Sequence, residues 1–349
     1  MPREKTVYIL GAGFSKAANL PLQGELLPAV LKQENENSNS IKNFIKTVYG
    51  LVGDAAKQLA LEDVYTPIHQ AISSGQYLKS YTPDKLKEVE RCLNLEIANV
   101  MNDRVGHDKY AQDFVDYLQG HSLPRRDSFS IISLNWDIML DKILFQKLKQ
   151  DTDVNGNRRG LLNYCNYGTQ IWKYNEVSGT NLTSSRNRNT IKLLKLHGSL
   201  NWVSCPRCNR LFINPNEKSA IAAYTRTATC KKCEGGVKLE TEIALPTFQK
   251  DLSRIHFQHI WHKAAIELSE ATKLVFVGYS FPLADFDFRA LITKHVSTTT
   301  AVEVVLYSHD KRPTPEGQRY IDYFGNHRCS IRYDGVEAYV NSLNHSPTE

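Results

Sequence analysis

Five short apolar segments, each followed at once by small or polar residues, constrain the fold of this 349-residue chain more than any other feature. They are KTVYIL before GAGFS (11–15), FSIISL before NWD (135–137), IKLLKL before HGS (197–199), LVFVG before YSF (279–281) and VEVVLY before SHD (308–310). Short apolar runs bounded by turn residues are typical of buried parallel strands. Ligands of open α/β sheets bind beyond the carboxyl ends of the strands. The sequence therefore predicts an α/β fold with a parallel sheet and one functional site along one sheet edge.

The overall composition is that of a folded protein. Hydrophobic residues make up 41% and charged residues 23% of the chain, which allows a full core and argues against wholesale disorder. The length of 349 residues predicts either one large domain with insertions or two domains. A net charge of +6 permits an anionic ligand or a nucleic acid but argues for neither.

The N-terminal segment and the cysteines indicate the compartment. No apolar run approaches the roughly 18 residues that cross a bilayer. The first apolar stretch is short and ends in Gly11-Ala12-Gly13, which favours a first strand and turn over a signal peptide. Because four cysteines also form a metal-binding pattern, we expect a cytoplasmic protein with reduced thiols.

The periodicity of apolar residues changes along the chain. Residues 5–33 are predicted to form a strand, a glycine turn and a helix, and the α/β pattern resumes at 128. Between about 41 and 121, apolar residues recur at spacings of three and four with no strand-like run, which predicts a helical insertion. Residues 151–190 are rich in Asn, Gly, Ser, Thr and Arg and are predicted to be a long surface loop. A final short helix is expected near 335–343.

A cysteine quartet gives the most specific local signal. Cys205-Pro-Arg-Cys208 and Cys230-Lys-Lys-Cys233 form two CxxC pairs with 21 residues between them. Four thiolates on two tight knuckles satisfy a tetrahedral zinc ion and leave no position for water. The pattern predicts a closed, structural zinc site.

The glycine turn Gly11–Ser15 allows two interpretations. Small residues after a strand let backbone N–H groups approach a pyrophosphate. The turn lacks the full GxGxxG spacing, because Ala17 and Ala18 follow where a third glycine would stand. An ordinary tight turn between a strand and a helix fits equally well.

Polar residues after three other strands are candidates for chemistry. Asn135 and Asp137 follow a predicted strand, where helix capping would account for one of them but hardly for both. His197 ends another strand beside Gly198, a glycine that lets a substrate approach. Ser280 follows Gly278, where it could meet phosphate or ribose hydroxyls, or simply cap a loop. No GxSxG elbow or phosphate-loop lysine is present, which argues against a serine hydrolase or a phosphate-loop ATPase.

Together and in this order, the clusters resemble the motifs of the sirtuin superfamily (the silent information regulator fold), in particular its divergent bacterial branch. Sirtuins carry a GAGxS turn, an Asn-x-Asp, a His-Gly pair, a four-cysteine zinc module and a glycine–serine strand end. The matching residues here are Gly11–Ser15, Asn135 and Asp137, His197 and Gly198, the cysteine quartet, and Gly278 with Ser280. The resemblance covers roughly residues 5–310.

The resemblance implies a Rossmann-like parallel sheet with helices on both faces, a helical insertion and a small four-cysteine zinc module. The NAD-binding domain would comprise residues 1–40, 122–202 and 238–345, with the helical insertion at 41–121 and the zinc-binding module at 203–237. NAD and a structural zinc ion are therefore the expected ligands.

The resemblance also implies roles for individual residues. His197 would hydrogen-bond the ribose hydroxyls and serve as general base, with a pKa near the ordinary value of ~6.5. Asn135 would position the ribose hydroxyls or the attacking water, and Asp137 would hold the nicotinamide end or orient Asn135. The residues expected to contact the rest of the cofactor are Gly11, Ala12, Gly13, Phe14, Ser15, Gly278, Ser280 and Ser308.

Departures from the deacetylase pattern favour another reaction. The stretch Asn19–Gly24 lacks the aromatic residue and the arginine of deacetylases, and Leu245–Asp251 lacks their peptide-clamping strand. KLHGSLNW, LPTFQKD and VGYSFPLADFDFR look like sirtuin-like effectors of bacterial anti-phage systems, several of which cleave NAD. The resemblance thus implies a NAD+ hydrolase that forms nicotinamide and ADP-ribose and is restrained by self-assembly or by a separately encoded partner. The alternatives are a NAD-dependent protein deacylase, an ADP-ribosyltransferase, and a non-enzymatic NAD or ADP-ribose sensor.

Overall fold

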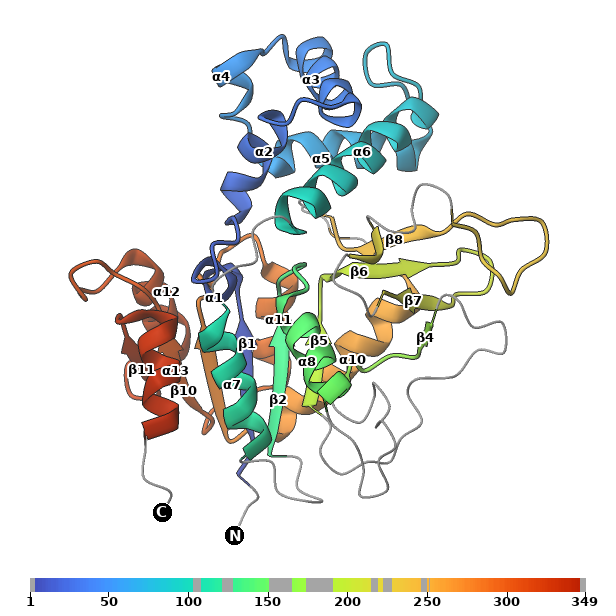
Figure 1. Cartoon of the computed structure of the whole chain (residues 1–349). Helices are drawn as coiled ribbons and strands as arrows, with labels where there is room; N and C mark the ends of the chain where they lie inside the picture. The colour runs from blue at the N-terminus through green and yellow to red at the C-terminus, as the bar shows by residue number, and fades with distance from the viewer. Residues whose placement is uncertain are drawn as a thin grey trace.

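The computed structural model contains a large parallel sheet covered by helices, a second small sheet and a unit of helices (Figure 1). It describes residues 4–102, 108–120, 128–150, 165–173, 191–214, 219–221, 228–245, 250 and 252–345. Of the predicted loop at 151–190, only residues 165–173 lie within these ranges, and of Leu245–Asp251 only Leu245 and Lys250 do. Among the described residues, no helix is both long and apolar enough to cross a membrane.

The main sheet has seven strands in the order β11-β10-β9-β1-β2-β5-β3, and all of its neighbouring strands are parallel. The strands are β1 (Thr6–Leu10), β2 (Phe129–Ser133), β3 (Cys165–Asn166), β5 (Ile191–Lys195), β9 (Lys273–Val277), β10 (Ala301–Val305) and β11 (Cys329–Arg332). The predicted α/β fold with a parallel sheet is confirmed. After β1 the chain builds one half of the sheet through β2, β3 and β5, and it then returns to the other side of β1 with β9. The boundary between β1 and β9 is therefore the topological switch point of the sheet.

Helices cover both faces of this sheet, as predicted. On the near face in Figure 1 lie α7 (Lys109–Gly120), α8 (Met139–Gln150) and α13 (Gly335–His345), and α10 (Ile255–Glu270) and α11 (Phe286–His295) lie behind the sheet. A short helix, α1 (Ala12–Lys16), follows β1 directly, and α12 (Pro315–Phe324) precedes β11. The strand residues facing these helices are fully buried, among them Val7, Ile9, Ile132, Leu193 and Phe276.

A second group of helices stands above the carboxyl edge of the sheet (Figure 1). It consists of α2 (Gln23–Leu31), α3 (Glu36–Tyr49), α4 (Gly53–Ala56), α5 (Leu61–Ser74) and α6 (Pro83–Asn102). The Asn35 side chain accepts a hydrogen bond from the Ser38 amide and caps α3, and Gly50 ends that helix in a left-handed conformation. These helices pack around Phe44 and Tyr65 in a second hydrophobic core, which also includes Val203, Cys205 and Phe212 from later in the chain. By contrast, α7 packs against α8 and α13 beside the main sheet, so we propose that the helical insertion ends with α6.

The small sheet has the order β4-β7-β6-β8 and was not predicted. Its strands are β4 (Ile171–Lys173), β6 (Gly198–Ser204), β7 (Leu211–Ile213) and β8 (Glu240–Ile243). The strand β6 pairs antiparallel with β7 and β8, and Trp202 at its centre is fully buried. Three of these strands have only three or four residues, too short for an alternation of apolar and polar residues to reveal them.

The backbone at the switch point is packed without room for side chains. The Gly11 amide donates to the Val277 carbonyl over 3.1 Å, and the Gly13 amide donates to the Gly278 carbonyl over 2.7 Å. A Cβ atom on Gly11 would lie 2.6 Å from the Tyr279 Cα, and one on Gly13 would lie 2.7 Å from the Gly278 oxygen. Gly278 has a φ of +62° and would place a Cβ 2.2 Å from the Phe14 nitrogen. These glycines are required by the close approach of β9 to the turn after β1.

We predict that Gly278→Ala lowers the free energy of unfolding by about 2–4 kcal/mol, because it combines a disfavoured backbone conformation with a steric clash. Gly24→Ala is the matched control, since a Cβ at this helical glycine meets nothing within 4 Å. Alanine there should be neutral or stabilise the protein by up to about 1 kcal/mol. Urea unfolding of both variants tests the prediction, and equal stabilities would contradict it.

Candidate functional site

The parallel sheet brings the predicted clusters to one edge. Leu10 at the end of β1 pairs with Ser133 of β2 and with Val277 of β9, so these three strands end level with one another. The residues after them, including Gly11, Asn135 and Gly278, are therefore neighbours at the switch point. This is where open α/β sheets bind their ligands.

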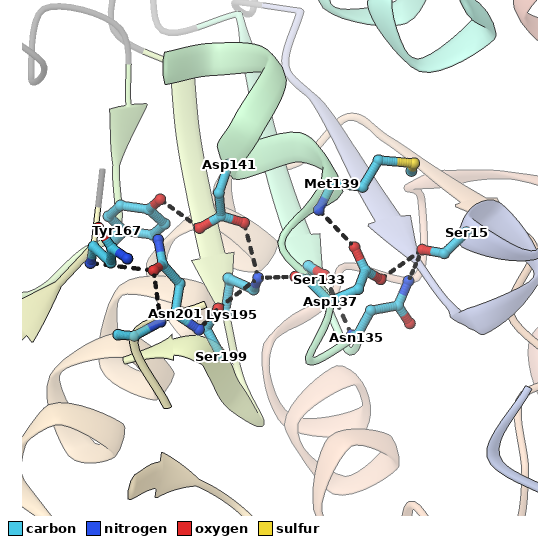
Figure 2. A network of polar contacts seen from close by, with 12 residues as sticks. Ser15, Ser133, Asn135, Asp137, Met139, Asp141, Tyr167, Lys195, Ser199 and Asn201 are labelled. Atoms are coloured by element: carbon cyan, nitrogen blue, oxygen red, sulfur yellow. Dashed lines mark hydrogen bonds and ion pairs between the residues drawn. The ribbon is translucent and has the colours of Figure 1, made fainter. Parts of the chain in front are cut away.

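Asn135, Asp137 and Ser15 are joined by hydrogen bonds (Figure 2). The Ser15 hydroxyl donates to Asp137 Oδ2 over 2.6 Å, and the Asn135 side-chain amide donates to the Gly11 carbonyl over 2.8 Å and to Ser15 Oγ over 3.1 Å. Asp137 Oδ1 accepts from the Met139 amide at the start of α8, so capping accounts for one of its oxygens. Asp137 is buried and Asn135 is partly exposed. Of the two, Asn135 is the side chain that a ligand can reach.

His197 is buried next to Asn135. Its Nδ1 lies 3.1 Å from the Leu134 carbonyl, which can only accept, so Nδ1 carries the proton. The other ring nitrogen, Nε2, is buried and has no hydrogen-bond partner among the described residues. In the neutral imidazole this nitrogen presents a lone pair. His197 Nε2 can therefore accept a hydrogen bond or a proton from a ligand.

The charge state of His197 differs from the expectation. Burial lowers the pKa of His197 to about 4; the Asp285 carboxylate opposes this shift, and the Lys250 ammonium adds to it. The pKa near 6.5 expected from the sequence is therefore wrong, because that value applies to a solvated imidazole. At neutral pH the His197 ring is uncharged and able to accept a proton.

An ion pair that the sequence did not single out lies near His197. Lys250 Nζ is 2.5 Å from Asp285 Oδ1, and the Tyr279 hydroxyl donates to Asp285 Oδ2 over 2.8 Å. Burial alone would raise the pKa of Asp285, but the positive charge that His197 carries when protonated, the Lys250 ammonium and the two hydrogen bonds outweigh it, so the net shift is downward. Asp285 is therefore an anion beside the neutral imidazole, with its charge balanced by Lys250.

The remaining predicted residues occupy different positions. Phe14 is buried edge-to-face against Tyr110, so only its backbone is available to a cofactor. Ala12 and Gly278 are partly exposed at the switch point, and Ser280 is exposed beyond it. Ser308 follows β10, and its hydroxyl donates to Asp310 over 2.9 Å. Their roles toward a cofactor stay predictions.

The cysteine quartet fits a tetrahedral metal ion. Four sulfur atoms bound to zinc at about 2.3 Å lie about 3.8 Å from one another. Cys205 Sγ is 3.8 Å from Cys233 Sγ, Cys208 Sγ is 3.7 Å from Cys230 Sγ, and all four atoms lie within 4.8 Å of each other. The predicted ligand set is thus brought together, with a donor type that zinc prefers. The cluster lies at the end of β6, the strand that begins directly after His197.

The chain is similar to solved Sir2 structures at low sequence identity. No family model and no curated protein matches the chain. A Sir2 homologue–NAD complex is 15% identical with a TM-score of 0.47, covering 97% of this chain and 87% of that one. A Sir2 homologue variant with ADP-ribose is 14% identical (TM-score 0.47, 97% and 90% covered), and a Sir2–peptide–NAD+ complex is 11% identical (0.44, 97% and 91%).

We predict that Cys208→Ser reduces bound zinc from about one ion per chain to near zero, because a structural zinc site requires all four thiolates. Cys329→Ser, outside the quartet, is the control and should keep the metal. Elemental analysis of both purified variants measures the zinc content. Equal zinc in the two variants would contradict the assignment.

We also predict that His197 makes the protein sensitive to acid. The unfolded chain takes up a proton at this residue near pH 6.5 and the folded chain only near pH 4, so acidification across that window favours unfolding. The full effect is about 3 kcal/mol. Free energies of unfolding at pH 7 and pH 4 should therefore differ less in His197→Gln than in the wild type. His262→Gln, at an exposed histidine, should behave as the wild type.

Proposed function

We propose that this protein is a sirtuin-like NAD+ hydrolase that cleaves the nicotinamide–ribose bond with water, giving nicotinamide and ADP-ribose. The observation that carries the proposal is the buried, neutral His197, whose Nε2 is free among the described residues. It follows β5 at the carboxyl edge of the parallel sheet, and its ring contacts the carbonyl of Leu134, the residue before Asn135. The order of the sequence motifs, GAGFS, NWD, HGS and GYS, supports the choice of NAD.

The chemistry needs a base and a positioned water. As the C1′–nitrogen bond of NAD breaks, its electron pair leaves with nicotinamide, and C1′ acquires oxocarbenium character. The oxygen of water bonds to C1′, and one of its protons passes to His197 Nε2, from which it returns to solvent. Asn135 would hold the water or the ribose hydroxyls through its side-chain oxygen, because its nitrogen already donates to Gly11 and Ser15.

The nucleophile distinguishes this reaction from its alternatives. A deacylase would use an acyl-lysine peptide and an ADP-ribosyltransferase a protein side chain, after the same bond cleavage. The stretch Leu245–Asp251 lacks the peptide-clamping strand of deacetylases, and this supports water as the nucleophile. Lys250 from this stretch is paired with Asp285 beside His197.

We further propose a role as an effector of bacterial anti-phage defence, supported by the resemblance of KLHGSLNW and VGYSFPLADFDFR to such proteins. Depletion of NAD harms the host cell, so activity has to be restrained until infection. Self-assembly or a separately encoded partner would supply the restraint. A purified monomer that hydrolyses NAD at full rate would contradict this part of the proposal.

The decisive experiment measures nicotinamide release from NAD, with and without an acetyl-lysine peptide. We expect release without peptide and a fall of about 10²–10⁴-fold in His197→Ala, the range for loss of a general base. Asn135→Ala should also reduce the rate strongly, since water and ribose lose their positioning.

His256→Ala is the matched control, because His256 is also a buried histidine but bonds to Thr169, away from the switch point. It should keep nearly the wild-type rate. Release that requires the peptide would identify a deacylase, and tight NAD binding without any release would favour a sensor.

A further inference from the structure

Lys195 is a buried lysine that the proposed reaction does not use. It is the last residue of β5, two positions before His197, and its side chain is 2% exposed. Its partner, Asp141 of α8, is 1% exposed, and the two charged groups are 2.9 Å apart. Taking two charges out of water is costly, and replacing such a pair by apolar residues is often neutral for stability. Stability alone therefore does not explain the pair.

Every hydrogen of the Lys195 ammonium has an acceptor (Figure 2). One goes to Asp141 Oδ2, one to the backbone carbonyl of Asp137, and one to Ser199 Oγ over 2.9 Å. An ammonium group has three donors, so none is left for a ligand. On the other side, the Tyr167 hydroxyl donates to Asp141 Oδ1 over 2.5 Å and fixes the carboxylate.

These contacts join the segments that carry the two main site residues. Through the Asp137 carbonyl, the ammonium holds the segment after β2 that contains Asn135. Through its own backbone and Ser199, it holds the β5–β6 connection that contains His197. The ammonium thus adds side-chain contacts between these two segments to the hydrogen bonds that already join them, from the Leu196 amide to the Ser133 carbonyl and between His197 Nδ1 and the Leu134 carbonyl.

We propose that Lys195 and Asp141 form a positioning pair, whose role is to fix the Asn135–Asp137 segment relative to His197. The proposal rests on the proposed function for its kinetic readout, but it makes a structural claim of its own. The competing explanation is an ordinary core ion pair that contributes only to folding.

The test is the double substitution Lys195→Met with Asp141→Leu, which removes both charges and keeps similar volumes. We expect a folded protein with a melting temperature close to that of the wild type. We expect kcat to fall 10–100-fold with KM changed less than about threefold, because a misplacement of about 1 Å in a site costs up to about 10²-fold in rate. A wild-type kcat would overturn the proposal.

A matched control comes from a second buried pair at the opposite edge of the sheet. Lys5 and Glu267 are 2.8 Å apart, with side chains 5% and 4% exposed, and each has one further partner that is more exposed, Glu270 and Lys192. Lys5→Met with Glu267→Leu should leave kcat unchanged. An equal loss of kcat in both double variants would show a general effect of buried pairs and overturn the positioning role.

Two further measurements test the positioning role if the double variant does not fold or if the wild type is inactive. If the Lys195 double variant does not fold, Tyr167→Phe removes the hydrogen bond to Asp141 at nearly constant volume. It should lower kcat severalfold in a protein that still folds, with a melting temperature reduced by only a few degrees. If the wild type releases no nicotinamide, either as a monomer or after self-assembly, no rates can be compared, and the NMR resonance of the Asn135 side-chain amide tests the positioning alone. That resonance should shift in the Lys195 double variant and not in the Lys5 control; no shift would overturn the proposal.

Discussion

The rest of the site depends on the contact between two backbone segments at the centre of the sheet. The turn after β1 and the end of β9 exchange hydrogen bonds at distances that exclude any Cβ atom on Gly11, Gly13 or Gly278. This contact fixes where α1 begins, and so where the Ser15 hydroxyl meets Asp137 and Asn135. Glycine in this motif thus serves the packing of the protein first, and any approach of a cofactor has to use what that packing leaves exposed.

Burial and nearby charges determine which side chains of the site are charged. The His197 imidazole is uncharged because it is removed from water, while nearby Asp285 remains an anion because Lys250 and Tyr279 compensate it. The neutral imidazole of His197 and the carboxylate of Asp285 are thereby held close to each other without sharing a proton. Because Lys250 already balances Asp285, a proton accepted by His197 adds one positive charge here, and the nearby Asp285 carboxylate stabilises that charge.

Much of the frame was predictable from the sequence, because strand ends and cysteine pairs are local patterns. The parallel sheet and the grouping of Cys205 with the other three cysteines follow from runs of a few residues. The small sheet was missed because β4, β7 and β8 are only three or four residues long, and because β4 and β8 pair with strands distant in the sequence. Lys195 and Asp141 are visible as charges inside apolar segments, but which groups they contact is a property of the folded chain. The pKa of His197 likewise depends on residues from distant elements.

Strands β5 and β6 lie in different sheets, and the connection between them is only two residues long. Strand β5 of the main sheet ends at Lys195 and β6 of the small sheet begins at Gly198, so His197 lies in the hinge between them. The cysteine quartet at the far end of β6 is therefore tied to the imidazole by a single continuous strand. A displacement of the cysteine quartet along β6 would therefore act on the backbone next to His197.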